Sequence, residues 1–448
     1  MKNNSIKYKF GICAIALSLV FPSCEIEDIP DPNNPTIESV LENAGIPSLN
    51  NLVTGTEAAM RIDIGTYYDD VGVVGREYYR FSGADPRFTS DLLGAGNAVL
   101  DNNTFYTTRP WNARYRAVKN ANILISSANN TNQITEEQKQ GYLGFAKTIK
   151  AHQLLMNLTL MNENGIRVDV DDPDNLGPVV DRPAALTAIA ALLDEAQTHL
   201  QGAGETFPFS LSSGYQDLVN ADPKDPFGPD EFLEFNRALA ARVAVYRENF
   251  GAALQALQGS FLELNTNFNK GIYYTFSDAS GDIVNPLFIG RNAKGELRLA
   301  HPSFVTDATP GDDRLSKVAL RDEPATQSGL TSRYDITVFS SNTDPVPIIR
   351  NEELILIYAE AKIQTDALLD AVSALNIIRT GHGLQPYTGL VTKDALINEM
   401  LRQRRYSLFF EGHRWIDLRR YNRLGQLPID RPGDDVWVSF PIPFNEGT

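Results

Sequence analysis

Cysteine is scarce in this sequence: among 448 residues there are two, Cys13 and Cys24. A framework of several disulfides or a zinc site built from several thiolates is therefore excluded. The five histidines show neither His-Glu-x-x-His nor His-x-His spacing, and no Gly-x-Ser-x-Gly elbow is present. GAGNAV (94–99) begins like a dinucleotide loop but has Val99 where the third glycine belongs. These absences remove the best-marked classes of metal, serine and nucleotide-dependent enzymes.

Long apolar runs and excess positive charge are also missing. Beyond the first two dozen residues, no stretch approaches the ~20 apolar residues that a membrane-spanning helix needs. Lysine and arginine number 40 against 56 acidic residues, for a net charge of -16. An acidic surface repels phosphate backbones, which argues against nucleic acid as the partner. With 42% hydrophobic residues, the chain can still bury a large core.

The amino terminus has the layout of a secretory signal. Three lysines without an acid precede a mostly apolar run, residues 10–20, and the small Ser23 directly precedes Cys24. LVFPSC resembles a bacterial lipobox, although Phe21 stands where most lipoboxes have leucine. We expect residues 1–23 to be removed as a lipoprotein signal peptide and Cys24 to be acylated. An ordinary secretory signal and a cytosolic protein remain the alternatives.

The residues after Cys24 predict a flexible leash. EIEDIPDPNNP (25–35) carries three prolines and four acids, so residues 24–35 are expected to form a lipidated, extended and solvated segment. Residues 36–448 then form the body of the protein.

Helical periodicity dominates this body. Residues 134–158 begin with a capping box, Thr135 and Gln138, and residues 186–200 repeat apolar side chains at steps of three and four. Residues 235–258 and 352–379 each predict two helices with a short break, and their alanines allow close helix packing. These pairs resemble degenerate tetratricopeptide units. The predicted fold is mainly α: a tetratricopeptide-like repeat scaffold with long irregular loops and a few short strands.

The central stretch, about 265 to 348, has turn residues between short β-prone runs. Long irregular segments on a helical scaffold are where binding usually occurs. The acidic run 169–177 could hold calcium, but Pro173 and Leu176 break the ligand alternation of an EF-hand loop, which favours a solvated loop. We therefore expect no metal site and no cofactor.

The last hundred residues carry three ordered motifs: VPIIRNEELILIYAEA (346–361), ALNIIRTGHGL (374–384) and LRQRRYSLFFEGHRWIDLRRYNRLG (401–425). Together they resemble the carboxy-terminal signature of the SusD/RagB family of outer-membrane nutrient-binding lipoproteins. WNARYRAVKNANILI (111–125) resembles the family's amino-terminal helix more loosely. Gln403 departs from the glutamate that members often have there, which removes one possible ion pair. The resemblance extends over nearly the whole chain.

The resemblance implies a single SusD-like domain over 36–448, with an amino-terminal part at about 36–260 and a carboxy-terminal part at about 285–448. The resemblance implies that the protein is not an enzyme and that it is lipid-anchored in the outer membrane and exposed at the cell surface. There it would capture oligo- or polysaccharide and deliver it to a TonB-dependent, SusC-like transporter. The acids after the lipidated cysteine resemble a signal for surface display. Peptide capture by the same architecture is an alternative. A glycoside hydrolase is another, because 56 acids always offer some carboxylate pair.

The signature residues themselves predict scaffold rather than a ligand site. Apolar side chains in RRYSLFFEGHRWIDLRR fall at helical steps, and we expect Trp415 to be buried, as we do Trp111. The charged residues of the motif, Arg414 among them, could pair across neighbouring turns.

The binding site must be predicted from the chemistry of sugars, whose C–H groups pack on aromatic faces and whose hydroxyls need donors and acceptors. REYYRFSGADPR (76–87) offers this in a segment that its turn residues mark as loop-like, and GIYYTFSD (271–278) is similar. In an alternating strand half of these rings would face the core. Our predicted ligand-binding residues are, first, Tyr78, Tyr79, Arg80 and Asp85, and second, Tyr273 and Tyr274.

Overall fold

The computed structural model describes residues 41–218 and 227–446. The predicted signal peptide, the lipidation site Cys24 and the leash at 24–35 lie outside the described residues. Within the described ranges, no helix combines the length and the apolar character needed to cross a bilayer.

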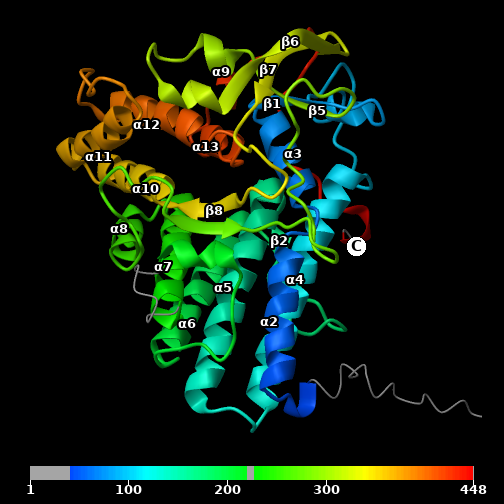
Figure 1. The fold of residues 1–448 in the computed structure, drawn as a ribbon, viewed down its shortest axis with the longest axis vertical. Coiled ribbons are helices and arrows are strands. Elements are labelled where there is room, and N and C mark those ends of the chain that lie inside the picture. The colour runs from blue at the N-terminus through cyan, green and yellow to red at the C-terminus, as the bar shows by residue number, and fades with distance from the viewer. Residues whose placement is uncertain (1–40, 219–226, 447–448) are drawn as a thin grey trace, which may run out of the picture.

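Five long helices run side by side through the lower half of Figure 1: α2, α4, α5, α6 and α7. In chain order the first helices are α2 Ile46–Met60, α3 Ile64–Val74, α4 Phe105–Asn130, α5 Glu136–Met161 and α6 Arg182–Gln201. Helix α5 packs between α4 and α6 and is buried on nearly every side from Gly141 onward.

Local sequence signals explain where α5 and α6 begin. Thr135 and Gln138 form the predicted capping box at α5, and the Asp181 carboxylate accepts a hydrogen bond from the amide of Ala184 at α6. All five apolar positions predicted for the buried face of α6 are buried, namely Leu186, Ile189, Leu193, Ala196 and Leu200. Both helix predictions are confirmed.

The helices that follow α6 include two stacked pairs, the first of which begins with α7. Their bounds are α7 Pro229–Tyr246, α8 Phe250–Gln258, α9 Ser303–Thr306, α10 Asn351–Gln364, α11 Leu368–Gly381, α12 Lys393–Ser407 and α13 Arg414–Arg420. The pairs α7 with α8 and α10 with α11 are the two predicted helix pairs, and α10 also packs against α7 and α8. The mainly α, tetratricopeptide-like scaffold is confirmed.

The largest sheet lies at the upper end of the molecule, whereas β8 and β2 lie near mid-height (Figure 1). The four-stranded sheet has the order β1-β5-β7-β6, with antiparallel neighbours. The strand bounds are β1 Tyr78–Phe81, β2 Ile166–Arg167, β3 Val179–Val180, β4 Gly271–Tyr274, β5 Leu297–Ala300, β6 Val318–Gln327, β7 Leu330–Ile336 and β8 Val346–Arg350. The central stretch thus has the short strands that its sequence predicts.

One expectation is wrong: residues 78–81 are not loop-like but form strand β1, with Tyr78 opposite Ala300 and Phe81 opposite Leu297. The partner strand β5 lies far along the chain, so the turn residues after Phe81 give no indication of this pairing. Burial in a sheet decides the environment of the predicted tyrosines.

The carboxy-terminal signature is scaffold, as predicted. Trp415 and Trp111 are 0% and 1% exposed. Arg350 forms an ion pair with Glu411 at 2.7 Å, and Arg404 forms one with Asp417 at 2.6 Å; the side chains of both pairs are largely buried. Removing one partner of such a buried pair leaves an uncompensated charge and costs about 3–5 kcal/mol.

Candidate functional site

The first two tyrosines predicted to bind a ligand, Tyr78 and Tyr79, are buried. Tyr78 is 1% exposed, and its hydroxyl donates to the Tyr68 carbonyl at 2.8 Å. A methyl group placed on Gly72 would lie 2.2 Å from the Tyr78 ring, so the helix backbone of α3 approaches that ring directly. Tyr79 stacks on Phe81 with centroids 5.6 Å apart. Both rings serve packing in this structure, and neither offers an open face to a sugar.

The second pair lies in a different sheet, because Tyr273 and Tyr274 belong to β4, which pairs with β8. Tyr274 is buried, whereas Tyr273 is partly exposed. The structure therefore does not bring the six predicted residues together as one site. Ligand binding by these tyrosines stays a prediction.

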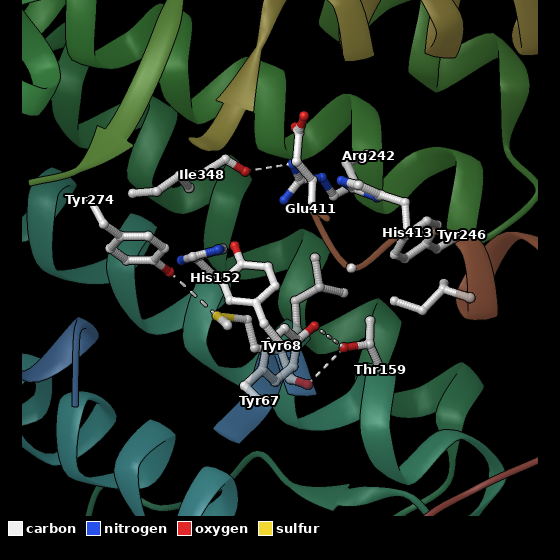
Figure 2. Close-up of a pocket in the computed structure, with 14 residues that line it drawn as sticks. Tyr67, Tyr68, His152, Thr159, Arg242, Tyr246, Tyr274, Ile348, Glu411 and His413 are labelled. Atoms are coloured by element: carbon white, nitrogen blue, oxygen red, sulfur yellow. Dashed lines mark hydrogen bonds between the residues drawn. The ribbon is translucent and has the colours of Figure 1, made fainter. Parts of the chain in front are cut away.

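A small cavity lies where Tyr274 meets α3, α5 and α7 (Figure 2). Its volume of about 40 Å³ is far below the roughly 300 Å³ at which ligand pockets begin. Burial, reinforced by the Arg242 and Arg114 charges, lowers the pKa of His152 on its wall to about 3, so this imidazole is neutral at pH 7. The cavity has room for a few water molecules and none for a sugar ring.

Arg80 and Asp85 surround a different aromatic pair, Phe88 and Phe105. The two partly exposed rings meet edge to face with centroids 5.1 Å apart. The Arg80 guanidinium lies 5.1 Å from the centroid of Phe88, and that of Arg87 lies 4.9 Å from the centroid of Phe105. We call these five residues the Phe88–Phe105 surface.

Local hydrogen bonds hold this surface in place. Asp85 caps the short helix η1, Pro86–Phe88, by accepting from the Arg87 amide at 3.0 Å. The Arg87 side chain returns to Asp85 through Nε at 2.9 Å and Nη2 at 2.6 Å, and it donates to Thr104 Oγ1 at 2.6 Å. Strand β1 places Arg80 beside Glu296, 2.6 Å away. The rings of Phe88 and Phe105 are thus held beside the guanidinium groups of Arg80 and Arg87 and the carboxylate of Asp85.

Sequence reasoning missed Phe88 and Phe105. Phe88 has no aromatic neighbour in the sequence, and Phe105 is followed by the buried Tyr106 alone, so neither segment has the crowding of rings seen at 78–81. The available signal was the Asp85-Pro86-Arg87 start of a helical turn, which predicts that Phe88 is held one turn away from the capping carboxylate.

Asp85, and Glu296 beside this surface, are poor proton donors. The hydrogen bond from Arg87 lowers the pKa of Asp85. Burial acts in the opposite direction at Glu296, but hydrogen bonds from Ser82 and Arg80 prevail and lower its pKa as well. Glycoside hydrolysis requires one carboxyl that is still protonated when it meets the substrate. The geometry therefore suits binding of a polar, ring-shaped ligand better than its cleavage.

No cluster of three or more His, Cys, Asp or Glu side chains that could hold a metal ion occurs in the part of the chain that the structure describes.

Comparison with known proteins identifies the family of the signature. Residues 331–435 match the sequence profile of the SusD family. The chain is SusD-like. This confirms the predicted resemblance to the SusD/RagB family. No curated protein sequence matches the chain.

Solved structures share the SusD-like fold over almost the whole length. A SusD superfamily protein from Bacteroides vulgatus is 16% identical, with 90% of this chain and 96% of that chain covered and a TM-score of 0.66. A laminarin-binding SusD-like protein is 18% identical, with 90% and 97% covered and a TM-score of 0.63. Surface glycan-binding protein A from Bacteroides uniformis is 15% identical, with 84% and 88% covered and a TM-score of 0.63. At these identities the likeness establishes the fold.

Proposed function

We propose that this SusD-like protein is a non-catalytic glycan-binding lipoprotein that captures oligo- or polysaccharide. The observation that carries the proposal is the SusD-like fold, shared over 90% of the chain with a structure described as laminarin-binding. The Phe88–Phe105 surface supports it, since partly exposed rings beside charged groups are what sugar recognition requires.

The proposed cellular role follows from the family resemblance. Lipid on Cys24 anchors the protein to the outer membrane, where it is exposed at the cell surface and delivers its ligand to a TonB-dependent, SusC-like transporter. A single acyl chain binds membranes only marginally, so a protein held in this way carries more than one chain. Recovery of a barrel protein with the tagged chain from native membranes supports this role, and its absence in detergent extracts counts against it.

Within the Phe88–Phe105 surface we assign the ring contacts to Phe88 and Phe105 and the hydroxyl contacts to Arg80, Asp85 and Arg87. The first two of these polar residues also belong to the site predicted from sequence. Tyr78, Tyr79 and Tyr274 would have to leave their buried positions to touch a ligand. Their role is settled by the same binding experiments.

The proposal is tested by calorimetry and gel retardation across soluble polysaccharides, with one peptide mixture as a further arm. We expect binding of a polysaccharide with a Kd of roughly millimolar to tens of micromolar, equivalent to about 4–6 kcal/mol, as suits a protein that passes its cargo on. Binding of the peptide mixture alone would support peptide capture instead. Release of reducing ends from a bound polysaccharide would establish a hydrolase.

A further inference from the structure

A second open pocket, distinct from the Phe88–Phe105 surface, has a volume of about 540 Å³ and lies among α9, α12, α13 and the short helix η5, Leu424–Gln426. Figure 1 shows α9 above the α12 and α13 layer. Four arginines line this pocket, namely Arg402, Arg405, Arg414 and Arg423. The carboxylates that line it are Asp307 and Asp417. We call this site the Arg414 pocket; its lining carries more cations than anions although the whole chain is acidic.

Arg414 is the unusual member of this group. Its neighbours in the signature have partners: Arg404 binds Asp417 at 2.6 Å, Arg420 binds Glu360 at 2.8 Å, and Arg419 donates to the Thr159 carbonyl at 2.7 Å. The Nε atom of Arg414 is buried without a hydrogen-bond partner. Nothing within residues 41–218 or 227–446 forms a hydrogen bond or an ion pair with its guanidinium. The expectation that Arg414 pairs across a neighbouring turn is not met.

Two more donors beside it are also unsatisfied. The hydroxyl of Tyr406, a residue that is only 1% exposed, and the Nε of Arg405 have no hydrogen-bond partner among the described residues. Both residues line the same pocket as Arg414. Buried polar groups are nearly always paired, so several unpaired donors around one opening indicate a missing acceptor.

The nearby carboxylates do not supply that acceptor. Asp307 pairs with Arg405 at 2.9 Å, while Asp417 accepts from Arg404 and Arg420. Burial raises the pKa of Glu77, and although the Arg414 charge acts on this carboxyl, neither of its oxygens forms a hydrogen bond with Arg414 or with any other described residue. Burial and then repulsion by Arg405 lower the pKa of Arg414 to about 9, and the guanidinium remains charged at pH 7.

We propose that the Arg414 pocket binds an oxyanion, a carboxylate or a sulfate group, carried by an acidic saccharide. Guanidinium groups bind such anions through two parallel hydrogen bonds, and the Tyr406 hydroxyl adds a third donor. The volume falls within the range of pockets that enclose small ligands. A net charge of -16 repels anions elsewhere, so recognition of this group is local. The proposal that a saccharide carries the anion rests on the proposed function. The proposal that the pocket binds an anion rests on the unpaired donors that line it.

The test measures binding of four probes by calorimetry: a galacturonic acid trisaccharide, a sulfated disaccharide, a neutral glucose trisaccharide and sodium sulfate. Arg414→Gln removes the unpaired charge, and Tyr406→Phe removes one hydroxyl while keeping the ring, so the second variant keeps the fold even if the first does not. Arg116→Gln, at an exposed arginine outside the pocket, is the control for net charge.

We expect Arg414→Gln to weaken binding of an acidic saccharide at least tenfold and Tyr406→Phe to weaken it about threefold to tenfold, as loss of a charged or a neutral hydrogen bond does. Arg116→Gln leaves it unchanged. Comparison of the galacturonate and sulfate probes identifies which anion the pocket prefers.

Equal binding of every acidic probe by the wild type and by both pocket variants would overturn the anion site. Such a result would not affect the proposed function, because that function rests on binding of neutral glycan. Conversely, sulfate binding that depends on Arg414, in a protein that binds no neutral saccharide, would support the anion site and count against the broader function. Dependence on Arg414 seen with sodium sulfate but with neither acidic saccharide would overturn the proposal that the anion is carried by a saccharide.

Discussion

Arg242 of α7 and Glu353 of α10 form a buried two-point ion pair that joins the two tetratricopeptide-like helix pairs. Arg242 Nε lies 2.7 Å from Oε1 of Glu353 and Nη2 lies 2.6 Å from Oε2. Arg242 also donates to the Ile348 carbonyl at 2.7 Å, in the middle of β8. One guanidinium thus connects an early helix to the strand and the helix that begin the carboxy-terminal signature.

The first prediction concerns the stability of this connection. Glu353→Gln keeps the size of the side chain but leaves the Arg242 charge buried without a counterion, so we expect the free energy of unfolding to fall by about 3–5 kcal/mol. Urea denaturation at pH 7 measures it. The matched control is Glu195→Gln, because Glu195 pairs with Lys147 at an exposed site and such pairs contribute about 0–1 kcal/mol. Equal effects of the two variants would contradict the assignment.

The second prediction is the pH dependence of the same pair. Burial opposes ionisation of Glu353, but the Arg242 and His413 charges prevail and lower its pKa from 4.5 to about 2. A carboxyl whose pKa is lowered by folding stabilises the native state above its unfolded pKa, and this contribution is lost as the pH falls toward the folded pKa. Between pH 4.5 and pH 2, the wild type should therefore lose stability more steeply than Glu353→Gln. Parallel curves for the two proteins would contradict this prediction.

The third prediction separates packing from ligand binding at Tyr78. Tyr78→Phe removes the hydroxyl that donates to the Tyr68 carbonyl and to Asp69, at 2.8 and 3.1 Å. We expect a loss of about 1 kcal/mol in the free energy of unfolding, with unchanged affinity for the glycan. Thermal unfolding and calorimetry on one preparation give both values. Lower affinity at unchanged stability would instead support the sequence-based prediction that Tyr78 contacts the ligand.

The fourth prediction concerns membrane attachment. Cys24→Ala should abolish acylation, because the only other cysteine, Cys13, lies within the predicted signal peptide. Fractionation should then find the variant outside the membrane pellet, whereas Cys13→Ala should leave the protein in the pellet. Retention of the Cys24→Ala protein in membranes would mean that something other than this lipid holds it.

The helices were predictable because their signals are local. The capping box of α5 and the three- and four-residue steps of α6 lie within each helix, and the structure confirms both. Strand β1 was not predictable in this way, because Tyr78 and Tyr79 are buried by pairing with β5, more than two hundred positions later. The sheet, rather than the composition of 76–87, decided the exposure of these rings.

The candidate sites show the same limit. Arg80 and Asp85 were predicted from sequence, but the rings that accompany them, Phe88 and Phe105, come from separate segments that only the fold brings together. The predicted pairing of the signature arginines holds for Arg404 and fails for Arg414. Periodicity indicates which residues share a helix face, whereas the absence of a partner is visible only in three dimensions.

Calorimetry on Phe105→Ala tests most directly whether the Phe88–Phe105 surface binds glycan. With the polysaccharide that the wild type binds, we predict a loss of more than ~1 kcal/mol in binding free energy in a protein that circular dichroism shows to be folded. Leu369→Ala is the control, because this side chain is 75% exposed and lies on α11. Unchanged affinity in folded Phe105→Ala, or an equal loss in Leu369→Ala, would contradict binding at this surface.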